Sequence, residues 1–168
     1  MKAEPRPLWP HAMATTPKRS LSRSAARLAA VQALYQQEME EIPVARLLHE
    51  FHQHRLGQRI DGAQYAEAEV DFFDDLVSGA DARSEEIDRL IADKLGAGWS
   101  LARLDKPMKA ILRAGAYELA ARADVPTASV ISEYVDVAKA FYDSRETGFV
   151  NGLLDALAKE VRAGNSAQ

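Results

Sequence analysis

Basic side chains recur near the start of the sequence at the spacing of a single helical face. Arg19, Arg23 and Arg27 are four residues apart, and Lys18 stands directly before them. In a helix, side chains four residues apart lie above one another. A row of guanidinium groups without interleaved acids can bind successive phosphates of a nucleic acid. The alternative is a solvated charged face, which needs no ligand.

Histidines gather between residues 49 and 54, where a metal site would be conceivable. The residues are His49, His52 and His54. A zinc-protease helix needs its second histidine four residues after the first, and Gln53 occupies that position. We therefore expect plain surface histidines and no metal. The sequence contains no cysteine, which excludes thiolate chemistry, disulfides and cysteine-based zinc sites.

Catalytic groups are equally hard to assemble from this sequence. Nine acidic residues lie between positions 67 and 88, on faces that the pattern turns outward. Paired carboxylates act as acid and base only where burial separates their pKa values. Gly96-Ala97-Gly98 lacks the preceding strand and the following Gly-Lys of a phosphate loop. We expect no catalytic residue, no cofactor and no enzyme activity.

The elements that position these groups are predicted to be helices. Apolar residues recur at intervals of three and four, and no segment shows the alternation of a strand. The predicted helical segments cover residues 19–38, 43–54, 65–95 with a polar interruption at 83–84, 99–122, one from 127 onward and one after Thr147-Gly148. The sequence therefore predicts an all-α fold of six or seven helices joined by short loops.

The first of these helices is predicted to have two opposite faces. The arginine row lies mostly opposite an apolar stripe, so we expect the guanidinium groups on the outside. The stripe consists of Leu21, Ala25, Leu28, Val31, Tyr35 and Met39.

Two later residues depart from the simple apolar pattern. Gly115 interrupts a strong helical stripe and lowers helix propensity, so we expect another helix to approach it closely. Phe149 lies roughly 100° from the stripe of the last helix, which includes Val150 and Leu154. It is either half-buried packing or a stacking platform for a base. Arg145 lies one turn earlier on the same side.

Charge is distributed unevenly along the 168 residues. The total is −4, but residues 1–37 hold six basic side chains against one acid, whereas the remainder holds 15 basic and 24 acidic ones. A basic end on an acidic body suggests an arm for phosphates and a body for another partner, such as a basic protein.

Residues 1–18 form a separate N-terminal region in this interpretation. They contain four prolines and no periodicity, so we expect a disordered basic extension, with Met13 as an alternative start. Neither a signal peptide nor a run of about 18 apolar residues is present. We therefore expect a cytoplasmic protein.

Five motifs, in this order and at these distances, make the chain resemble the NusB family of bacterial transcription antitermination factors. They are RSAARLAAVQALYQQE near the start, AILRAGAYEL at 110–119, DVP at 124–126, AKAF at 138–141 and FVNGLLD at 149–155. The resemblance covers about residues 19–163. It implies two small helical bundles packed together, in an RNA- and protein-binding domain over residues 19–168.

The resemblance also implies the function. Members of the family bind the single-stranded boxA element of nascent ribosomal RNA transcripts together with a ribosomal protein, NusE. They help RNA polymerase to read through terminators and aid ribosome assembly. The residues that it implies for RNA binding are Lys18, Arg19, Arg23, Arg27, Tyr35, Phe149 and Asn151.

The sequence departs from the family pattern at three places. Serines separate the arginines near the start, where the family often has adjacent arginines, and Leu28 follows the last arginine, where the family often has an acid. Arg145 stands where the family can carry an acid. Two other interpretations remain. The first is the RNA-binding domain of an rRNA cytosine methyltransferase, but that enzyme needs a catalytic domain with cysteines, and this sequence contains none. The second is a helical module that binds only protein.

Overall fold

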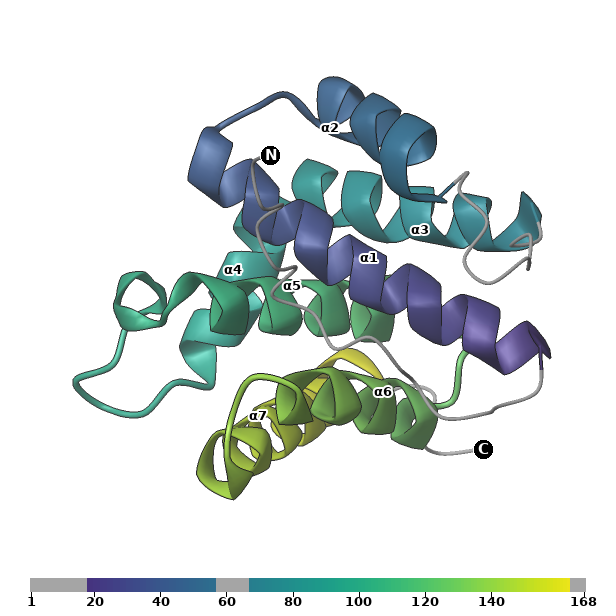
Figure 1. Ribbon diagram of the computed structural model, residues 1–168. Coiled ribbons are helices and arrows are strands. Elements are labelled where there is room, and N and C mark those ends of the chain that lie inside the picture. The colour runs from purple at the N-terminus through teal and green to yellow at the C-terminus, as the bar shows by residue number, and fades with distance from the viewer. Residues whose placement is uncertain (1–17, 57–66, 164–168) are drawn as a thin grey trace.

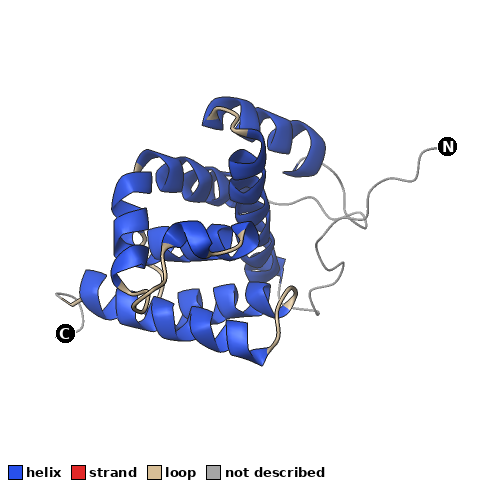
Figure 2. Ribbon diagram, turned by 90° about the vertical axis from the view of Figure 1, so that its left-hand side faces the viewer, coloured by secondary structure: helices blue, strands red, loops and turns tan. Residues whose placement is uncertain are grey.

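Every regular element in the described part of the chain is a helix. The computed structural model describes residues 18–56 and 67–163, and Figure 2 shows no strand among them. The α-helices are α1 (Lys18–Glu40), α2 (Val44–Phe51), α3 (Glu67–Ala82), α4 (Ser84–Asp93), α5 (Lys106–Ala121), α6 (Thr127–Lys139) and α7 (Ser144–Val161). A π-helical turn at His52–Leu56 and a 3-10 turn at Leu101–Arg103 complete the set. The predicted all-α class with six or seven helices is confirmed.

Helix α5 is the centre of the fold. It packs against α1 and α3 on one side, against α6 and α7 on the other, and against α4 (Figure 1). Ten of its residues are buried, because a helix surrounded by neighbours needs apolar residues on nearly all faces. The two groups of helices therefore share one hydrophobic core through α5.

Gly115 lies where side chains of α6 and α7 pack against α5. A Cβ atom at this position would lie 3.0 and 3.2 Å from the two Cδ atoms of Leu154, and 3.3 Å from the ring of Tyr134. These distances are shorter than ordinary van der Waals contacts. The predicted close approach of another helix at Gly115 is confirmed.

Several predicted helix boundaries are wrong. The segment predicted over 65–95 is divided at Arg83, the place of its polar interruption, into α3 and α4. Helix α5 begins at Lys106, later than the predicted position 99. Helix α7 begins at Ser144, so Thr147 and Gly148 lie in its first turns and do not precede it. An extended Asp143 ends the preceding loop and permits this earlier start.

The predicted orientation of α1 is also wrong. Its buried face consists of Ser24, Ala26, Arg27, Ala29, Ala30, Val31, Ala33 and Leu34. From the predicted stripe, Leu28 and Tyr35 are only partly buried and Met39 is 52% exposed. Alanines add little to a hydrophobic periodicity, but they let two helices approach closely. Helix α1 therefore turns its alanines, together with Arg27, toward α3 and α5.

The predicted disordered extension lies outside the described residues, apart from Lys18, with which α1 begins. Within the described ranges, no helix is both long enough and apolar enough to cross a lipid bilayer.

Candidate nucleic-acid interface

Arg27 is a buried residue with a buried partner. Its side chain is 4% exposed, and it donates hydrogen bonds from Nε and Nη2 to the carboxylate of Glu118 at 2.9 and 2.7 Å. Glu118, on α5, is completely buried. The prediction that Arg27 lies on the outside is therefore wrong. A buried guanidinium needs a carboxylate, because an unpaired charge in the core costs several kcal/mol.

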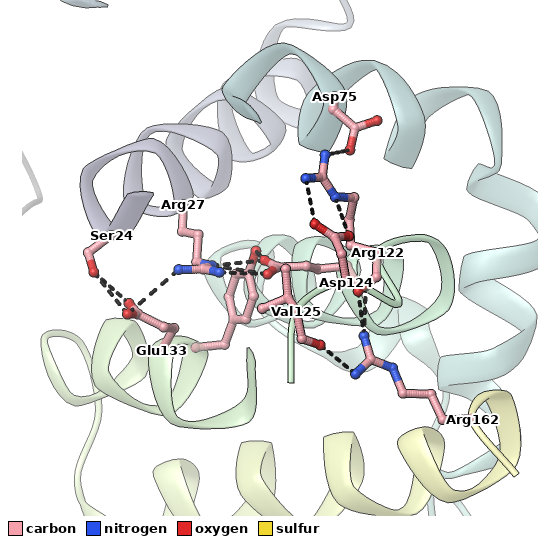
Figure 3. A network of polar contacts seen from close by, with 10 residues as sticks. Ser24, Arg27, Asp75, Arg122, Asp124, Val125, Glu133 and Arg162 are labelled. Carbon is pink, nitrogen blue, oxygen red and sulfur yellow. Dashed lines mark hydrogen bonds and ion pairs between the residues drawn. The ribbon is translucent and has the colours of Figure 1, made fainter. Parts of the chain in front are cut away.

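Further side chains complete this network from α6 (Figure 3). The hydroxyl of Tyr134 donates to Glu118 at 2.9 Å, and Nη1 of Arg27 lies 3.6 Å from Glu133. The hydroxyl of Ser24 donates to Glu133 at 2.9 Å. The network thus joins α1 to α5 and α6 at the start of α1.

The pKa shifts in the network agree with this geometry. Burial alone would lower the pKa of Arg27, but the hydrogen bonds and charge of Glu118 outweigh it and raise the pKa above its ordinary value. Burial, reinforced by Glu118, raises the pKa of Tyr134 well above its ordinary value. Arg27 is therefore charged, and Tyr134 neutral, at any physiological pH.

Sequence reasoning missed Glu118, although a signal was present. It is the only acidic residue in α5, in a run of apolar residues from Ile111 to Ala121. An acid at such a position requires a buried cation. Local periodicity could not show that the cation is Arg27, because it lies 91 residues earlier in the chain.

Arg23 differs from Arg27 although it lies only one turn earlier on α1. It is half-buried, and its guanidinium carbon lies 4.7 Å from the ring centre of Phe72 on α3, a cation–π distance. It has no ion pair or hydrogen bond with another described residue. Its positive charge is therefore available to an anionic ligand.

Two other described guanidinium groups lie over the ring of Phe72, and carboxylates neutralise both of them. The guanidinium of Arg27 lies 5.0 Å from the ring centre, and that of Arg122 lies 5.1 Å from it. Arg122 pairs with Asp124 at 3.1 Å and with Asp75 at 3.2 Å (Figure 3). Among the described guanidinium groups on this ring, Arg23 is thus the one without an ion pair, although its charge contributes to lowering the pKa of the nearby Asp124.

Arg162, just after α7, fixes the turn between α5 and α6. It donates hydrogen bonds to the backbone carbonyls of Arg122 and Val125 at 2.8 and 2.7 Å (Figure 3). It also donates one to the carbonyl of Leu119 at 2.9 Å. These carbonyls lie at or just beyond the C-terminus of α5, where cations are stabilised by the helix dipole. The turn that carries Asp124 is consequently held against the end of α7.

The structure describes the other predicted RNA-binding residues of α1 in less detail. Lys18 and Arg19 belong to the first turn of α1, but their side chains lie outside the described part of the structure. Tyr35, four turns later, is partly buried and packs against the core. It therefore combines the core position suggested by periodicity with a partly accessible ring.

Phe149 and Asn151 lie near the start of α7. Phe149 is 38% exposed, and Asn151 is exposed as well, whereas Val150 between them is completely buried. The predicted stripe of α7 faces the core, with Leu154 completely buried too. The ring of Phe149 is therefore partly packed and partly accessible, which fits both interpretations of this residue.

A half-open cavity of about 550 Å³ lies beside Phe149. Trp99, which is 59% exposed, lines it, together with Arg145 and Tyr142. The guanidinium of Arg103 lies 5.5 Å from the ring of Trp99. Exposed aromatic rings beside arginines are able to stack on nucleobases.

The predicted RNA-binding residues therefore do not form one continuous site. Figure 1 shows the start of α1 on the right of the molecule and the start of α7 on the left. The structure brings Arg23 and Arg27 together on Phe72, and it brings Phe149 together with Arg145 beside the cavity. A single ligand that reaches both regions has to be an extended one.

His49, His52 and His54 are exposed, as expected for surface residues. Nε2 of His52 lies 2.6 Å from a carboxylate oxygen of Asp74, which ties the end of the α2 region to α3. Among residues 18–56 and 67–163, no group of histidine and acidic side chains is arranged to hold a metal ion.

Comparison with known proteins gives a consistent assignment. The sequence model of the NusB family matches residues 24–159. The chain is 67% identical to the transcription antitermination protein NusB of Sphingopyxis alaskensis, over 86% of this chain and 97% of the relative. It is 63% identical to the protein of the same name from Novosphingobium aromaticivorans, over 84% and 95%.

Solved structures show the same fold. A structure of T. maritima NusB has a TM-score of 0.70 at 30% identity, covering 86% of this chain and 92% of that chain. Antitermination factors NusB and NusE in complex with dsRNA provide a second match, with a TM-score of 0.70 at 27% identity over 83% of this chain and 98% of that chain.

Proposed function

The chain belongs to the NusB family, and we propose that it is a transcription antitermination factor that binds boxA RNA together with the ribosomal protein NusE. The observation that carries the proposal is the 67% identity to an antitermination protein over nearly the whole length of that relative. Within the structure, the proposal is supported by the free guanidinium of Arg23 at the start of α1.

We assign the phosphate contacts to the start of α1. Lys18, Arg19 and Arg23 occupy its first two turns, and Arg23 has no carboxylate partner among the described residues. Cationic side chains of this kind neutralise phosphates and release the counterions around them. Arg27 is left out of this set, because its guanidinium is already bound to Glu118 in the core.

We assign base contacts to the start of α7. Phe149 is accessible on one side and Asn151 is exposed, so the ring can stack on a base and the amide can bind a base edge. Tyr35 is proposed as a further stacking residue through its accessible edge. An extended single strand is the kind of ligand that could reach from one region to the other.

The protein partner is proposed to bind the acidic body. Residues 38–168 carry nine more acidic than basic side chains, which favours a basic partner such as a ribosomal protein. The complex would form in the cytoplasm, where ribosomal RNA is transcribed, and the protein would act by binding and not by catalysis.

A titration against salt tests the RNA-binding function. The chain is titrated with a boxA oligonucleotide at several salt concentrations, with a scrambled sequence as control. We expect tighter binding to boxA and a linear decrease of log K with log salt. A pull-down from a bacterial lysate should recover NusE and ribosomal leader RNA. Absence of RNA binding in the titration, together with recovery of protein but no RNA in the pull-down, would support the purely protein-binding module.

A further inference from the structure

Two polar contacts anchor α1 close to Arg23. The next residue, Ser24, donates its hydroxyl proton to Glu133 of α6 at 2.9 Å. One turn later, Arg27 forms its two-pronged hydrogen bond with Glu118 of α5. The start of α1 is thus fixed to two different helices within one turn of Arg23.

The aromatic ring of Phe72 adds a third constraint. It lies under the guanidinium groups of both Arg23 and Arg27, at 4.7 and 5.0 Å, and is itself 3% exposed in the core. Any rotation of α1 about its axis would move both guanidinium groups off the ring. The place of Arg23 therefore depends on the place of Arg27.

We propose that Arg27 is a positioning residue for RNA binding, which acts through Glu118 and Phe72 to hold the guanidinium of Arg23 toward the RNA. The proposal rests on the proposed RNA-binding function. It gives two arginines of the same row two different roles. Arg23 contacts phosphate, whereas Arg27 contacts only protein.

A phosphate contact by Arg27 would have a high cost. The guanidinium would have to leave Glu118, which is completely buried, and the carboxylate would remain charged in the core. Tyr134 alone would then hydrogen-bond to it. Arg23, which breaks no ion pair with a described residue, can bind phosphate without this cost.

The test removes the buried charge pair without leaving a lone charge. In the double variant Arg27→Met/Glu118→Gln, the glutamine oxygen can still accept the proton of Tyr134, and apolar replacement of a buried ion pair is often tolerated. We expect this variant to fold and to bind boxA RNA about three- to tenfold more weakly than the parent, with an unchanged salt slope, because it loses an anchor of α1 but no phosphate contact. The single variant Arg27→Met, measured well below its melting temperature, should bind more than about tenfold more weakly, because Glu118 is left unpaired and α1 shifts.

Arg23→Ala is the matched control, four residues earlier on the same helix. It should lower the salt slope by about 0.7, the value for one phosphate contact on a single strand. The same decrease is expected when Arg23→Ala is added to the double variant. A spectroscopic measurement reports position directly: the side-chain protons of Arg23 should show a ring-current shift from Phe72 that is reduced both in Arg27→Met and in the double variant.

If Arg27→Met fails to fold, the variant Ser24→Ala still tests whether the anchoring of α1 positions Arg23. It removes only the anchor to Glu133, which is partly exposed. We expect weaker RNA binding by about two- to fivefold, a reduced ring-current shift on Arg23 and an unchanged salt slope.

Three results would overturn the proposal. The first is a double variant that folds but loses about 0.7 from the salt slope, since Arg27 would then contact phosphate. The second is a folded Arg27→Met variant or double variant that binds RNA like the parent, which would leave Arg27 a purely structural residue. The third is a parent chain without salt-dependent RNA binding, which would reject the proposed function and this inference with it.

Discussion

Replacing Phe149 with alanine separates RNA stacking from core packing. The ring is 38% exposed at the edge of the cavity beside α7, whereas the neighbouring Val150 is completely buried. The same helix therefore offers a matched pair of substitutions, Phe149→Ala and Val150→Ala. The first should affect mainly RNA binding and the second mainly folding.

The magnitudes follow from the burial of each side chain. Complete burial of a large apolar side chain contributes about 1.5–3 kcal/mol, and Phe149 is buried over about three fifths of its surface, so Phe149→Ala should lower the free energy of unfolding by about 1–2 kcal/mol. A fully buried phenylalanine would lose about 3–5 kcal/mol. Loss of a base stacked on the ring should cost about 1–3 kcal/mol of RNA affinity, or about 5- to 150-fold in the dissociation constant.

A melting curve and an RNA titration on the same preparations measure both effects. For a chain of this size, each kcal/mol corresponds to about 2–4 °C in melting temperature. Phe149→Ala should melt only a few degrees below the parent and bind boxA RNA much more weakly. Val150→Ala should lower the melting temperature, but it should bind RNA normally at a temperature where it is folded.

A third variant, Phe149→Tyr, keeps an aromatic ring at the same place. It should retain most of the RNA affinity if stacking is the cause. The reasoning would be refuted by a Phe149→Ala variant with intact RNA affinity and a melting temperature lowered by 10 °C or more. Phe149 would then be a packing residue only.

Three further predictions concern the packing and titration of the core. Gly115→Leu should destabilise the fold by about 1–3 kcal/mol in a melting curve, because even a Cβ would lie 3.0 Å from Leu154, and an unchanged stability would contradict this packing. Gly79→Ala should also destabilise the fold, because the new Cβ would come within 2.0–2.4 Å of the Tyr117 ring. Gly152→Ala places its Cβ in open space and should stabilise the fold by about 0.5–1 kcal/mol. Equal effects of the two substitutions on the free energy of unfolding would show that the space around the glycine does not decide the sign of the change. Burial and the hydrogen bond to Asp75 raise the pKa of Tyr117 to about 12. The neutral ring therefore contributes stability below about pH 10 that is lost as the pH rises toward 12. Tyr117→Phe should make the alkaline decrease in the free energy of unfolding smaller, and buried tyrosines such as Tyr134 account for the part that remains.

The helices could be predicted from sequence because their signals are local. Helix α5 shows a regular apolar pattern from Met108 to Leu119, and all of that face is buried. Glycine and proline lie in or near most of the loops. The start of α7 was missed because Thr147 and Gly148 look like a helix boundary, yet both are compatible with a first turn: Thr147 bonds to the carbonyl of Ser144, and Gly148 meets open space.

The orientation of α1 could not be predicted, because it depends on a distant residue. The large apolar side chains of α1, such as Leu28 and Tyr35, suggest one face, and the alanines suggest another. What decides between them is the buried Glu118 on α5, which needs a cation, and Arg27 is the cation that α1 offers. Local periodicity contains no information about this pair.

The position of Arg27 changes the strength of the electrostatic interaction that the sequence suggests. Counting basic side chains at the start of α1 gives four phosphate contacts, from Lys18, Arg19, Arg23 and Arg27. At about 0.7 per contact on a single strand, these would produce a salt slope of about 2.8. With Arg27 bound to Glu118, three cations remain and the slope from this region falls to about 2.1. The buried pair therefore removes one possible contact with RNA, but it fixes the orientation of the helix that makes the other contacts.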